Sequence, residues 1–525
     1  MTFHLQLLVK MAENIELLSL SDSINSLIDS LLVANRGEIA VRIIRSAQER
    51  GIRTIAVYSE PDRLAPHVLA ADEAYHIGPA PSSESYLKAE RLIEVAKVAG
   101  ADAIHPGYGF LAERSSFAKA VEDGGLIFVG PSSEVIEVMG DKIQARRYMQ
   151  NAGIPIIPGI TEPLSTVEAA LEVAQEIGFP VLVKAAAGGG GKGMRTVEKP
   201  DQFNAAFEAA QREAFSAFGD RTLYLERALK RPRHIEVQIL GDMQGSVVHL
   251  GERECSIQRR HQKLVEEAPA IALSTAERES IGRTAVQAAT AIGYTGAGTV
   301  EFLYEDGNYY FLEMNTRIQV EHPVTELVTG LDLVDWQIRI ASGEALDFTQ
   351  GDMRISGHAI ECRITAEDPQ IGFLPSTGTV TRLEVPTGAG VRWDGGIREG
   401  YYISEHYDPL LGKLIVHAST RAAAIQRMAR ALDELLLLGV ENCASFQRRV
   451  MDEPDFVEGR LSIRYLEEHP ELLNEAPVDP EVIRSIAIAG ALLEAKENQR
   501  TRLSRTTPKM SCWQSEGILR EPPRG

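Results

Sequence analysis

The chain has 525 residues, a formal net charge of −20, 44% hydrophobic residues and 24% charged residues. These values are typical of a globular protein, and the acidic excess excludes a nucleic-acid surface that depends on bulk positive charge. No apolar run reaches the roughly 18–20 residues that would span a bilayer, so we expect neither a nucleic acid nor a membrane as a partner.

A leader precedes the first folded pattern. Residues 1–28 match no targeting class, because acidic residues interrupt their apolar stretch and they contain no arginine. We expect this segment to be disordered or to reflect a start codon assigned too far upstream, with Met11 as another candidate start. Strand and helix patterns then alternate, as in the strand 31–34, the helix after Gly37 and the strand 54–58. This alternation predicts a Rossmann-like parallel sheet with helices on both faces and ligands beyond the carboxyl ends of its strands.

A glycine-rich loop follows a strand pattern that ends in Lys184. Residues 188–191 are consecutive glycines, whose backbone N–H groups can approach a phosphate without interference from Cβ atoms. A flexible linker is the alternative, but a linker needs neither the apolar strand and Lys184 before it nor Lys192 within it. The loop lacks the Gly-Lys-Ser/Thr sequence of a P-loop. We therefore expect a mobile lid, over about residues 160–230, that covers nucleotide phosphates.

A hairpin is predicted where two strand patterns flank Asp306, Gly307 and Asn308. If its loop has an odd number of residues and is centred on Gly307, Glu301 lies directly across from Glu313. Opposed carboxylates destabilise a sheet unless a cation lies between them, and oxygen ligands suit Mg²⁺ or Mn²⁺. A two-residue turn would instead place the two glutamates on opposite faces, so this prediction depends on the turn.

A stripe of polar residues continues from the hairpin at every second position: Glu313, Asn315, Arg317, Gln319 and Glu321. In an extended chain all five side chains share one face. Alternation alone favours an ordinary solvated face. The residue types, however, suit a metal-bound phosphate next to a small oxyanion, with a carboxylate at the end that can act as a base.

With these motifs in this order, the sequence resembles the biotin carboxylase family of ATP-grasp enzymes over about residues 30–470. The motifs that carry the resemblance are residues 34–40, 105–110, 139–142, 185–194, 259–263 and 313–323. The resemblance implies a multidomain fold of the α/β and α+β classes. Its expected parts are a Rossmann-like preATP-grasp domain (29–138), an ATP-grasp domain (139–350), a β-rich C-terminal domain (351–470), and a linker helix with an irregular tail (471–525).

The resemblance also implies a role for each candidate residue. The ATP site would contain Lys142, Lys184, Gly190, Gly191, Glu226, Arg227, Leu229, His234, Gln258 and His261. The divalent ions, Mg²⁺ or Mn²⁺, would be held by Glu301, Glu313 and Asn315. Bicarbonate would be bound by Lys263, Arg317, Gln319 and Val320. Glu321 would act as the general base toward bicarbonate, and Arg363 would stabilise the enolate of biotin.

The implied reaction converts bicarbonate and ATP to carboxyphosphate, whose breakdown supplies carbon dioxide to biotin. The sequence contains no Ala/Val-Met-Lys-Met biotin-attachment motif. We therefore expect biotin on a separate carrier protein, or a truncated chain, together with a carboxyltransferase subunit that selects the acyl-CoA. The resemblance also implies a homodimer.

Two other interpretations remain open at the level of the sequence: another ATP-grasp ligase that needs no biotin, and a non-catalytic scaffold subunit. The scaffold is disfavoured because each predicted site residue is present. The four cysteines have no metal-like spacing, which predicts free thiols in a reducing cytoplasm. Among them, Cys255 is expected to be a buried structural thiol.

Overall fold

The computed structural model describes residues 28–160, 164, 166–185, 194–474 and 480–504. The chain forms two units, one that ends at Leu473 and one that begins at Asn474, and each is described by itself. The leader therefore lies outside the described residues, except for its last position, and so do Gly190 and Gly191.

The N-terminal part of the first unit is a sheet of five parallel strands in the order β3-β2-β1-β4-β5. Its strands are β1 (Ser30–Val33), β2 (Arg53–Ser59), β3 (Glu73–Gly78), β4 (Ala103–His105) and β5 (Ile127–Phe128). The helices are α2 (Gly37–Glu49), α3 (Pro66–Ala70), α4 (Ala89–Ala99), α5 (Ser115–Asp123) and α6 (Ser133–Gly140).

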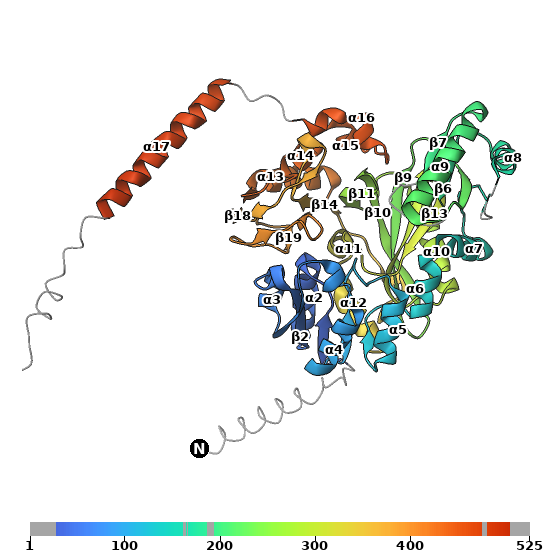
Figure 1. The fold of residues 1–525 in the computed structure, drawn as a ribbon, viewed down its shortest axis with the longest axis horizontal. Helices are drawn as coiled ribbons and strands as arrows, with labels where there is room; N and C mark the ends of the chain where they lie inside the picture. The colour runs from blue at the N-terminus through green and yellow to red at the C-terminus, as the bar shows by residue number, and fades with distance from the viewer. Residues whose placement is uncertain (1–27, 161–163, 165, 186–193, 475–479, 505–525) are drawn as a thin grey trace, which may run out of the picture. The chain divides into compact units, whose positions relative to one another are not determined.

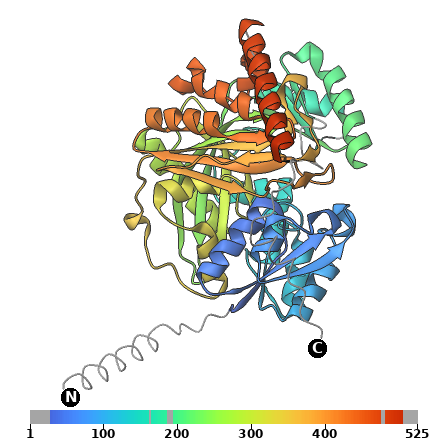
Figure 2. The ribbon, with the colours of Figure 1, turned by 90° about the vertical axis from the view of Figure 1, so that its left-hand side faces the viewer.

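Both faces of this parallel sheet are covered by helices, as the alternating pattern predicts (Figure 2). Leu31 and Val33 of β1 pack in one apolar cluster with Ile43 of α2. Leu32 of the same strand packs in another cluster with Leu92 of α4. Successive residues of β1 are therefore buried on opposite sides, which is the arrangement of a doubly covered parallel sheet.

A small sheet and two long helices form the next part, in green in Figure 1. It follows α7 (Lys142–Asn151), and its strands pair antiparallel in the order β7-β6-β8. The elements are α8 (Val167–Ile177), β6 (Val181–Ala185), β7 (Arg195–Val197), α9 (Phe203–Phe218) and β8 (Leu223–Arg227).

An antiparallel sheet of eight strands forms the centre of the first unit, in the order β13-β12-β9-β10-β11-β14-β21-β19. The first five are β9 (Arg233–Gly241), β10 (Val247–Arg259), β11 (Gln262–Ala268), β12 (Gly296–Glu305) and β13 (Asn308–Asn315). The other three are β14 (His358–Thr365), β19 (Val391–Gly395) and β21 (Leu410–Ala418). Because β11 pairs with β14, one sheet joins the predicted ATP-grasp region to the predicted C-terminal region.

Helices and short ladders complete the unit around the large sheet (Figure 1). The helices are α10 (Thr275–Ala291), α11 (His322–Thr329), α12 (Leu333–Ala341), α13 (Arg421–Glu434), α14 (Ala444–Asp452), α15 (Pro454–Glu458) and α16 (Tyr465–Glu468). The ladders pair β15 (Glu367–Asp368) with β16 (Leu374–Pro375), β17 (Gly378–Thr379) with β20 (Tyr402–Ile403), and β18 (Arg382–Glu384) with β22 (Leu436–Leu438).

Asp62, a buried carboxylate, joins the N-terminal sheet to the C-terminal region. It accepts two hydrogen bonds from Arg36, at 2.6 and 2.9 Å, and one each from Tyr86 and Tyr401. Burial alone would raise the pKa of Asp62, but the hydrogen bonds and charge of Arg36 lower it well below its ordinary value. Because the folded-state pKa is depressed, this stabilisation is present at neutral pH and is lost as the pH falls below about 4.

Asp62→Asn is expected to destabilise the first unit by about 3–5 kcal/mol, because it leaves the partly buried Arg36 guanidinium without its ionic partner. Urea unfolding of the full chain at pH 7 measures this effect. Near pH 3 the difference in unfolding free energy from the wild-type chain should be smaller. At that pH the stabilisation that ionised Asp62 gives to the wild-type chain begins to decrease. An unchanged midpoint at pH 7 would contradict this role of Asp62.

The second unit contains α17 (Pro480–Ser504), which lies within the range 471–525 where a linker helix is expected. Its apolar side chains, among them Ile486 and Leu492, are exposed. Within the described ranges of both units, none of the helices combines the length and apolar character that crossing a membrane requires.

Candidate active site

A row of charged side chains crosses four neighbouring strands of the large sheet. Arg253 in β10 pairs with Glu236 in β9, and Glu236 pairs with Glu301 in β12. Glu301 then pairs with Glu313 in β13. Arg253, Glu236 and Glu301 are buried, so the row places two carboxylates and a guanidinium where water does not screen them.

The turn of the β12–β13 hairpin contains two residues, because Glu305 pairs with Asn308. The turn is therefore the two-residue alternative, for which the sequence predicts the two glutamates on opposite faces. Asp306 and Gly307 have φ values of 49° and 80°, the positive values that a tight hairpin turn of this kind requires.

The two glutamates are nevertheless opposite each other, because a bulge corrects the register. Phe302 pairs with Phe311 while Glu301 pairs with Glu313, so β13 has an extra residue, Leu312, between the two pairs. The predicted pairing of Glu301 with Glu313 is confirmed, but the reason given for it is not.

A second bulge orients Lys263. Ile257 of β10 pairs with Val265 of β11, and Gln258 pairs with Lys263, so Leu264 is an extra residue. Because a one-residue shift moves a side chain to the other face of a sheet, this bulge turns Lys263 toward the face that carries the row of charges.

The Lys263 ammonium lies among three buried carboxylates. Its Nζ is 2.5 Å from Glu236, 2.9 Å from Glu301 and 2.6 Å from Glu321. Burial alone would lower the pKa of Lys263, but these carboxylates raise it well above its ordinary value. Lys263 is therefore a permanent positive charge at the centre of the site.

Glu301 is held from both sides by donors. Its Oε1 accepts hydrogen bonds from Lys263, from Asn315 at 2.9 Å and from Gln319 at 3.1 Å. Its Oε2 is 2.9 Å from Nε2 of His234. Burial would raise the pKa of Glu301, but Lys263 and then His234 lower it well below its ordinary value, so the carboxylate is ionised.

The polar stripe after the hairpin is not one extended strand, because β13 ends at Asn315 and the chain bends from residue 316. That part of the prediction is wrong. The side chains still converge: Arg317 donates to Asn315 at 3.1 Å and to Gln319 at 2.9 Å. The same guanidinium also donates a hydrogen bond from Nε to the carboxylate of Glu113 at 3.0 Å.

Glu321 is a fully buried carboxylate at the residue before α11. Lys263 contacts one of its oxygens, and Arg363 donates to the other at 2.9 Å. Arg363 also donates from Nε to Glu266 at 2.7 Å. Burial would raise the pKa of Glu321, but Lys263 and Arg363 lower it well below its ordinary value. Glu321 is therefore an ionised carboxylate between two positive charges.

Other predicted residues form a second group. Lys184 donates to Glu226 at 2.9 Å, and Lys142 lies 3.5 Å from Glu313. Burial and the nearby positive charges of Lys184, His234 and Lys142 lower the pKa of His261. Two further residues predicted for the ATP site lie nearer the surface: Arg227 is exposed and Leu229 is half-buried.

Several residues of the site are missed by the sequence patterns: Arg146, Glu236, Arg253, Glu266 and Lys413. Arg146 donates to Glu226 at 2.5 Å, beside Lys184. The signal for Glu236 was available, because His234, Glu236 and Gln238 alternate with apolar residues in β9. The buried positions of the others depend on which strands are neighbours, and a single strand pattern does not contain that information.

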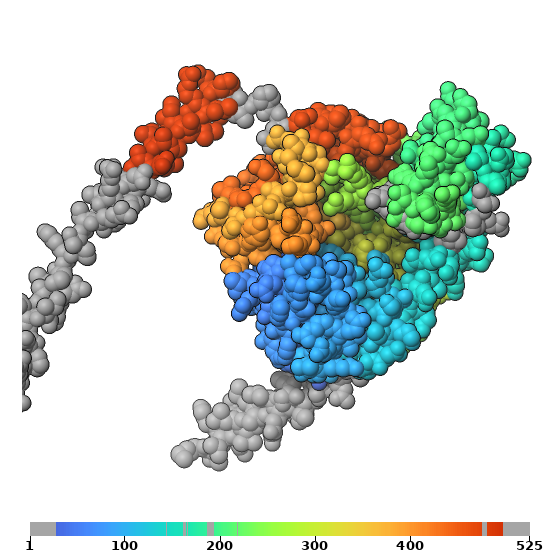
Figure 3. Space-filling view, in the orientation of Figure 1, coloured from blue at the N-terminus to red at the C-terminus, as the bar shows by residue number. Residues whose placement is uncertain are grey.

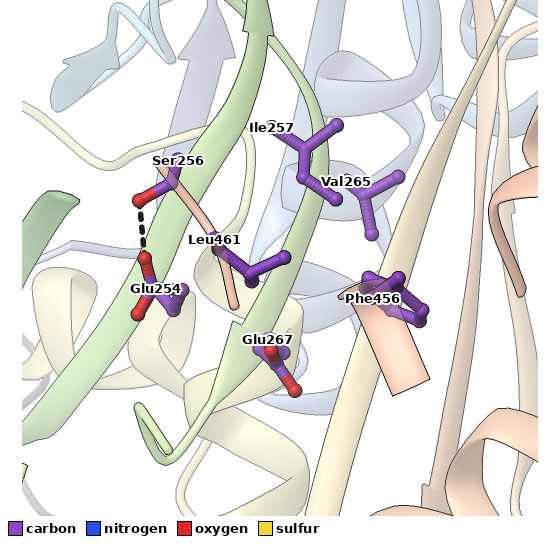
Figure 4. A pocket seen from close by; sticks show the side chains of 7 residues that line it. All are labelled: Glu254, Ser256, Ile257, Val265, Glu267, Phe456 and Leu461. Atoms are coloured by element: carbon purple, nitrogen blue, oxygen red, sulfur yellow. Dashed lines mark hydrogen bonds between the residues drawn. The ribbon is translucent and has the colours of Figure 1, made fainter. Parts of the chain in front are cut away.

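In the view of Figure 3, the yellow-green middle of the chain is visible between the blue N-terminal part, the green part and the orange C-terminal part of the first unit. A separate small pocket lies between β10, β11 and α15, with Phe456 and Leu461 in its wall (Figure 4). Its two carboxylates are already paired, Glu254 with Arg233 and Glu267 with Arg421. This pocket is therefore a packing defect beside charged pairs rather than a binding site.

Three family models match successive stretches of the chain. The N-terminal domain of biotin carboxylase matches residues 27–136, and its C-terminal domain matches residues 361–468. Between them, the ATP-binding domain of the carbamoyl-phosphate synthase L chain matches residues 141–349.

Curated relatives are similar over most of their length. The biotin carboxylase of Haemophilus influenzae is 49% identical over 442 residues, which cover 84% of this chain and 98% of that protein. The biotin carboxylase of a Nostoc species is 53% identical over 441 residues, which cover 84% of this chain and 99% of that protein.

Solved structures agree with these relatives. The biotin carboxylase domain dimer of 2-oxoglutarate carboxylase from Hydrogenobacter thermophilus, in complex with MgADP, ADP and bicarbonate, has a TM-score of 0.81 and 50% identity, with coverage of 86% and 99%. A biotin carboxylase from Campylobacter jejuni in complex with a β,γ-ATP compound has a TM-score of 0.81 and 48% identity, with coverage of 85% and 100%. The parallel sheet, the bulged hairpin that pairs Glu301 with Glu313, and these similarities lead to one conclusion: the chain belongs to the biotin carboxylase family.

Proposed function

We propose that this chain uses ATP and bicarbonate to carboxylate biotin that is attached to a separate carrier protein, as the first half-reaction of an acyl-CoA carboxylase. The observation that carries the proposal is Glu321, a buried ionised carboxylate held between Lys263 and Arg363. Arg317 lies in the same hydrogen-bonded group through Gln319. A proton acceptor beside fixed positive charges suits the activation of a small oxyanion.

Nucleotide binding is assigned to the second group of predicted residues. Lys142, Lys184 and His261 bring positive or hydrogen-bonding groups near one another, which suits a polyphosphate. Glu226 would orient Lys184. The other proposed contacts are Arg227, Leu229, His234 and Gln258, together with Gly190 and Gly191, which lie outside the described residues.

The donor set at the hairpin fits a hard divalent cation. Glu301 and Glu313 face each other across two paired strands, and Asn315 lies beside Glu301, to which its amide nitrogen donates, while its amide oxygen accepts from Arg317. Oxygen ligands of this kind suit Mg²⁺ or Mn²⁺. When bound, the ion would neutralise phosphate charge; Lys142 lies 3.5 Å from Glu313.

Bicarbonate binding is assigned to Lys263, Arg317, Gln319 and Val320. The planar guanidinium of Arg317 matches a planar oxyanion, provided that the anion replaces Glu113 or shares the guanidinium with it. Glu321 would take the bicarbonate proton, so that the bicarbonate oxygen attacks the γ-phosphate, forms carboxyphosphate and displaces ADP. Breakdown of that intermediate releases carbon dioxide and phosphate, and phosphate accepts the proton from the ureido nitrogen of biotin. That nitrogen then forms the new bond to carbon dioxide.

Arg363 is assigned to the negative charge that develops on the ureido oxygen of biotin. The guanidinium is already fixed by Glu266 and Glu321, so it needs no reorganisation when that charge forms. Biotin is proposed to arrive on a carrier protein, and a carboxyltransferase subunit would receive the carboxyl group. The homodimer, the cytoplasmic location and the domain boundaries given above stay predictions.

The proposed function is tested with the full chain, MgATP, bicarbonate and free biotin, by measuring phosphate release and carboxybiotin together. Phosphate release should require both bicarbonate and biotin and should match carboxybiotin formation. Release that needs bicarbonate but no biotin would favour another ATP-grasp ligase. ATP binding without any phosphate release would favour a scaffold subunit.

Glu313→Gln is expected to raise the Mg²⁺ concentration for half-maximal phosphate release by about tenfold or more, because it removes a charged oxygen ligand. Electron paramagnetic resonance of bound Mn²⁺ should show a matching loss of affinity in the presence of ATP. The matched control is Glu279→Gln, at an exposed position of α10. Equal Mn²⁺ affinity in the two variants would remove Glu313 from the metal site.

A further inference from the structure

Lys413, in the middle of β21, is a fully buried lysine that the predicted site does not include. Its Nζ donates to the backbone carbonyl of Val320 at 2.7 Å. It also lies 3.1 Å from Glu38 and 4.0 Å from Asp394. Lys413 is therefore a charged group from the C-terminal region that contacts the segment containing the proposed base.

The bond to Val320 fixes one peptide unit of that segment. A peptide group is planar and trans, so its C=O and N–H point in opposite directions. With the Val320 carbonyl directed at Lys413, the N–H of Glu321 must point away from Lys413. The orientation of the backbone at Glu321, the first residue before α11, is thereby set by a side chain from another strand.

Glu38 extends this contact to the N-terminal sheet. It lies in the first turn of α2, is buried, and accepts a hydrogen bond from Tyr108 at 2.5 Å. Tyr108 belongs to the glycine-containing turn after β4. The chain of contacts Tyr108–Glu38–Lys413–Val320 thus joins three parts of the first unit at the proposed base.

Packing alone gives no reason for a lysine at this position. A fully buried ammonium loses its hydration, and an apolar side chain of similar volume commonly gives equal or greater stability. Asp394 does not require Lys413 as its partner, because Arg392 donates two hydrogen bonds to it at 2.9 and 2.7 Å. What an apolar side chain cannot replace is the hydrogen bond to the Val320 carbonyl and the ion pair with the buried Glu38, and only the first of these contacts the segment of Glu321.

We propose that Lys413 is a positioning residue for bicarbonate activation, which acts by holding the Val320–Glu321 peptide through its carbonyl oxygen. The inference rests on the proposed function. Lys413 touches neither ATP nor bicarbonate in this role. Its removal should misplace Glu321 and leave the nucleotide groups on β6, β8 and α7 unchanged.

Two variants test the proposal in the full-length chain: Lys413→Met, and the double variant Glu38→Gln/Lys413→Met. The double variant removes one positive and one negative charge together, so no buried charge is left alone. Lys119→Met, at an exposed position of α5, is the matched control. The measurements are the thermal midpoint, the Kd of ATP by direct binding, and kcat/KM for bicarbonate.

Both variants are expected to lower kcat/KM for bicarbonate by about tenfold or more, because small displacements of a catalytic group have large effects. The Kd of ATP should change by less than about threefold, which separates this role from a general loss of structure. Wild-type bicarbonate kinetics in a folded double variant would overturn the proposal. Parallel loss of ATP binding, or failure of both variants to fold, would assign Lys413 to stability alone and would also overturn it. An inactive wild-type chain would instead contradict the proposed function.

Discussion

Arg363→Ala should lower kcat for biotin carboxylation by about 10²–10³-fold, which is the usual effect of removing one group that stabilises an oxyanion. The variant should still bind ATP, because Arg363 is in β14 and its ionic partners are Glu266 and Glu321 rather than the nucleotide group. The loss should appear in carboxybiotin formation at saturating ATP. The structure fixes the positive charge of Arg363 beside Glu321. The implied chemistry requires a fixed positive charge at that place.

The stability of the Arg363 variant needs its own measurement, since alanine leaves the two carboxylates without this partner. Arg363→Lys keeps the charge but loses the planar fork, so it should retain part of the activity. Arg283→Ala, at an exposed position of α10, is the control for removal of an arginine. A folded Arg363→Ala chain that carboxylates biotin at the wild-type rate would reject the assigned role.

Glu321→Gln should lower bicarbonate-dependent phosphate release by about 10²–10⁴-fold, the range expected for loss of a general base. Glutamine has the same size and can still accept from Lys263 or Arg363, but it cannot take a proton. ATP binding should be preserved. The measurement is phosphate release at saturating bicarbonate, in which a defect of chemistry appears in kcat.

The pH dependence of the wild-type chain provides a second check on Glu321. Lys263 and Arg363 hold the pKa of this buried carboxyl well below its ordinary value. The base is therefore already ionised at neutral pH, and its protonation should not reduce kcat until the pH is below about 4. A fall in kcat near pH 7 that disappears in Glu321→Gln would show that Glu321 titrates there and would contradict this assignment.

Much of the site follows from patterns within single strands. The alternation of polar residues identifies Glu313, Asn315, Arg317, Gln319 and Glu321, and the structure brings Asn315, Arg317 and Gln319 into contact although the strand ends at Asn315. The pairing of Glu301 with Glu313 is predicted from a turn that the hairpin does not have. The pairing instead results from the extra residue Leu312 in β13, and no turn pattern in the sequence predicts that residue.

The remainder depends on which strands are neighbours. Lys263 reaches the carboxylates only because Leu264 is an extra residue in β11. Glu236 and Arg253 join the site because β9 lies between β10 and β12. Periodicity within one strand determines the face on which a side chain lies, but long-range pairing determines which charges it meets.

The pairing of β11 with β14 has a consequence for how the chain can be divided. A fragment that stops near residue 350 would keep every nucleotide-binding candidate but would leave β11 as an open edge with unpaired backbone groups, which favours aggregation. Glu266 would also lose the guanidinium of Arg363. The parts of the first unit before and after residue 350 thus share one sheet, and neither is expected to fold well without the other.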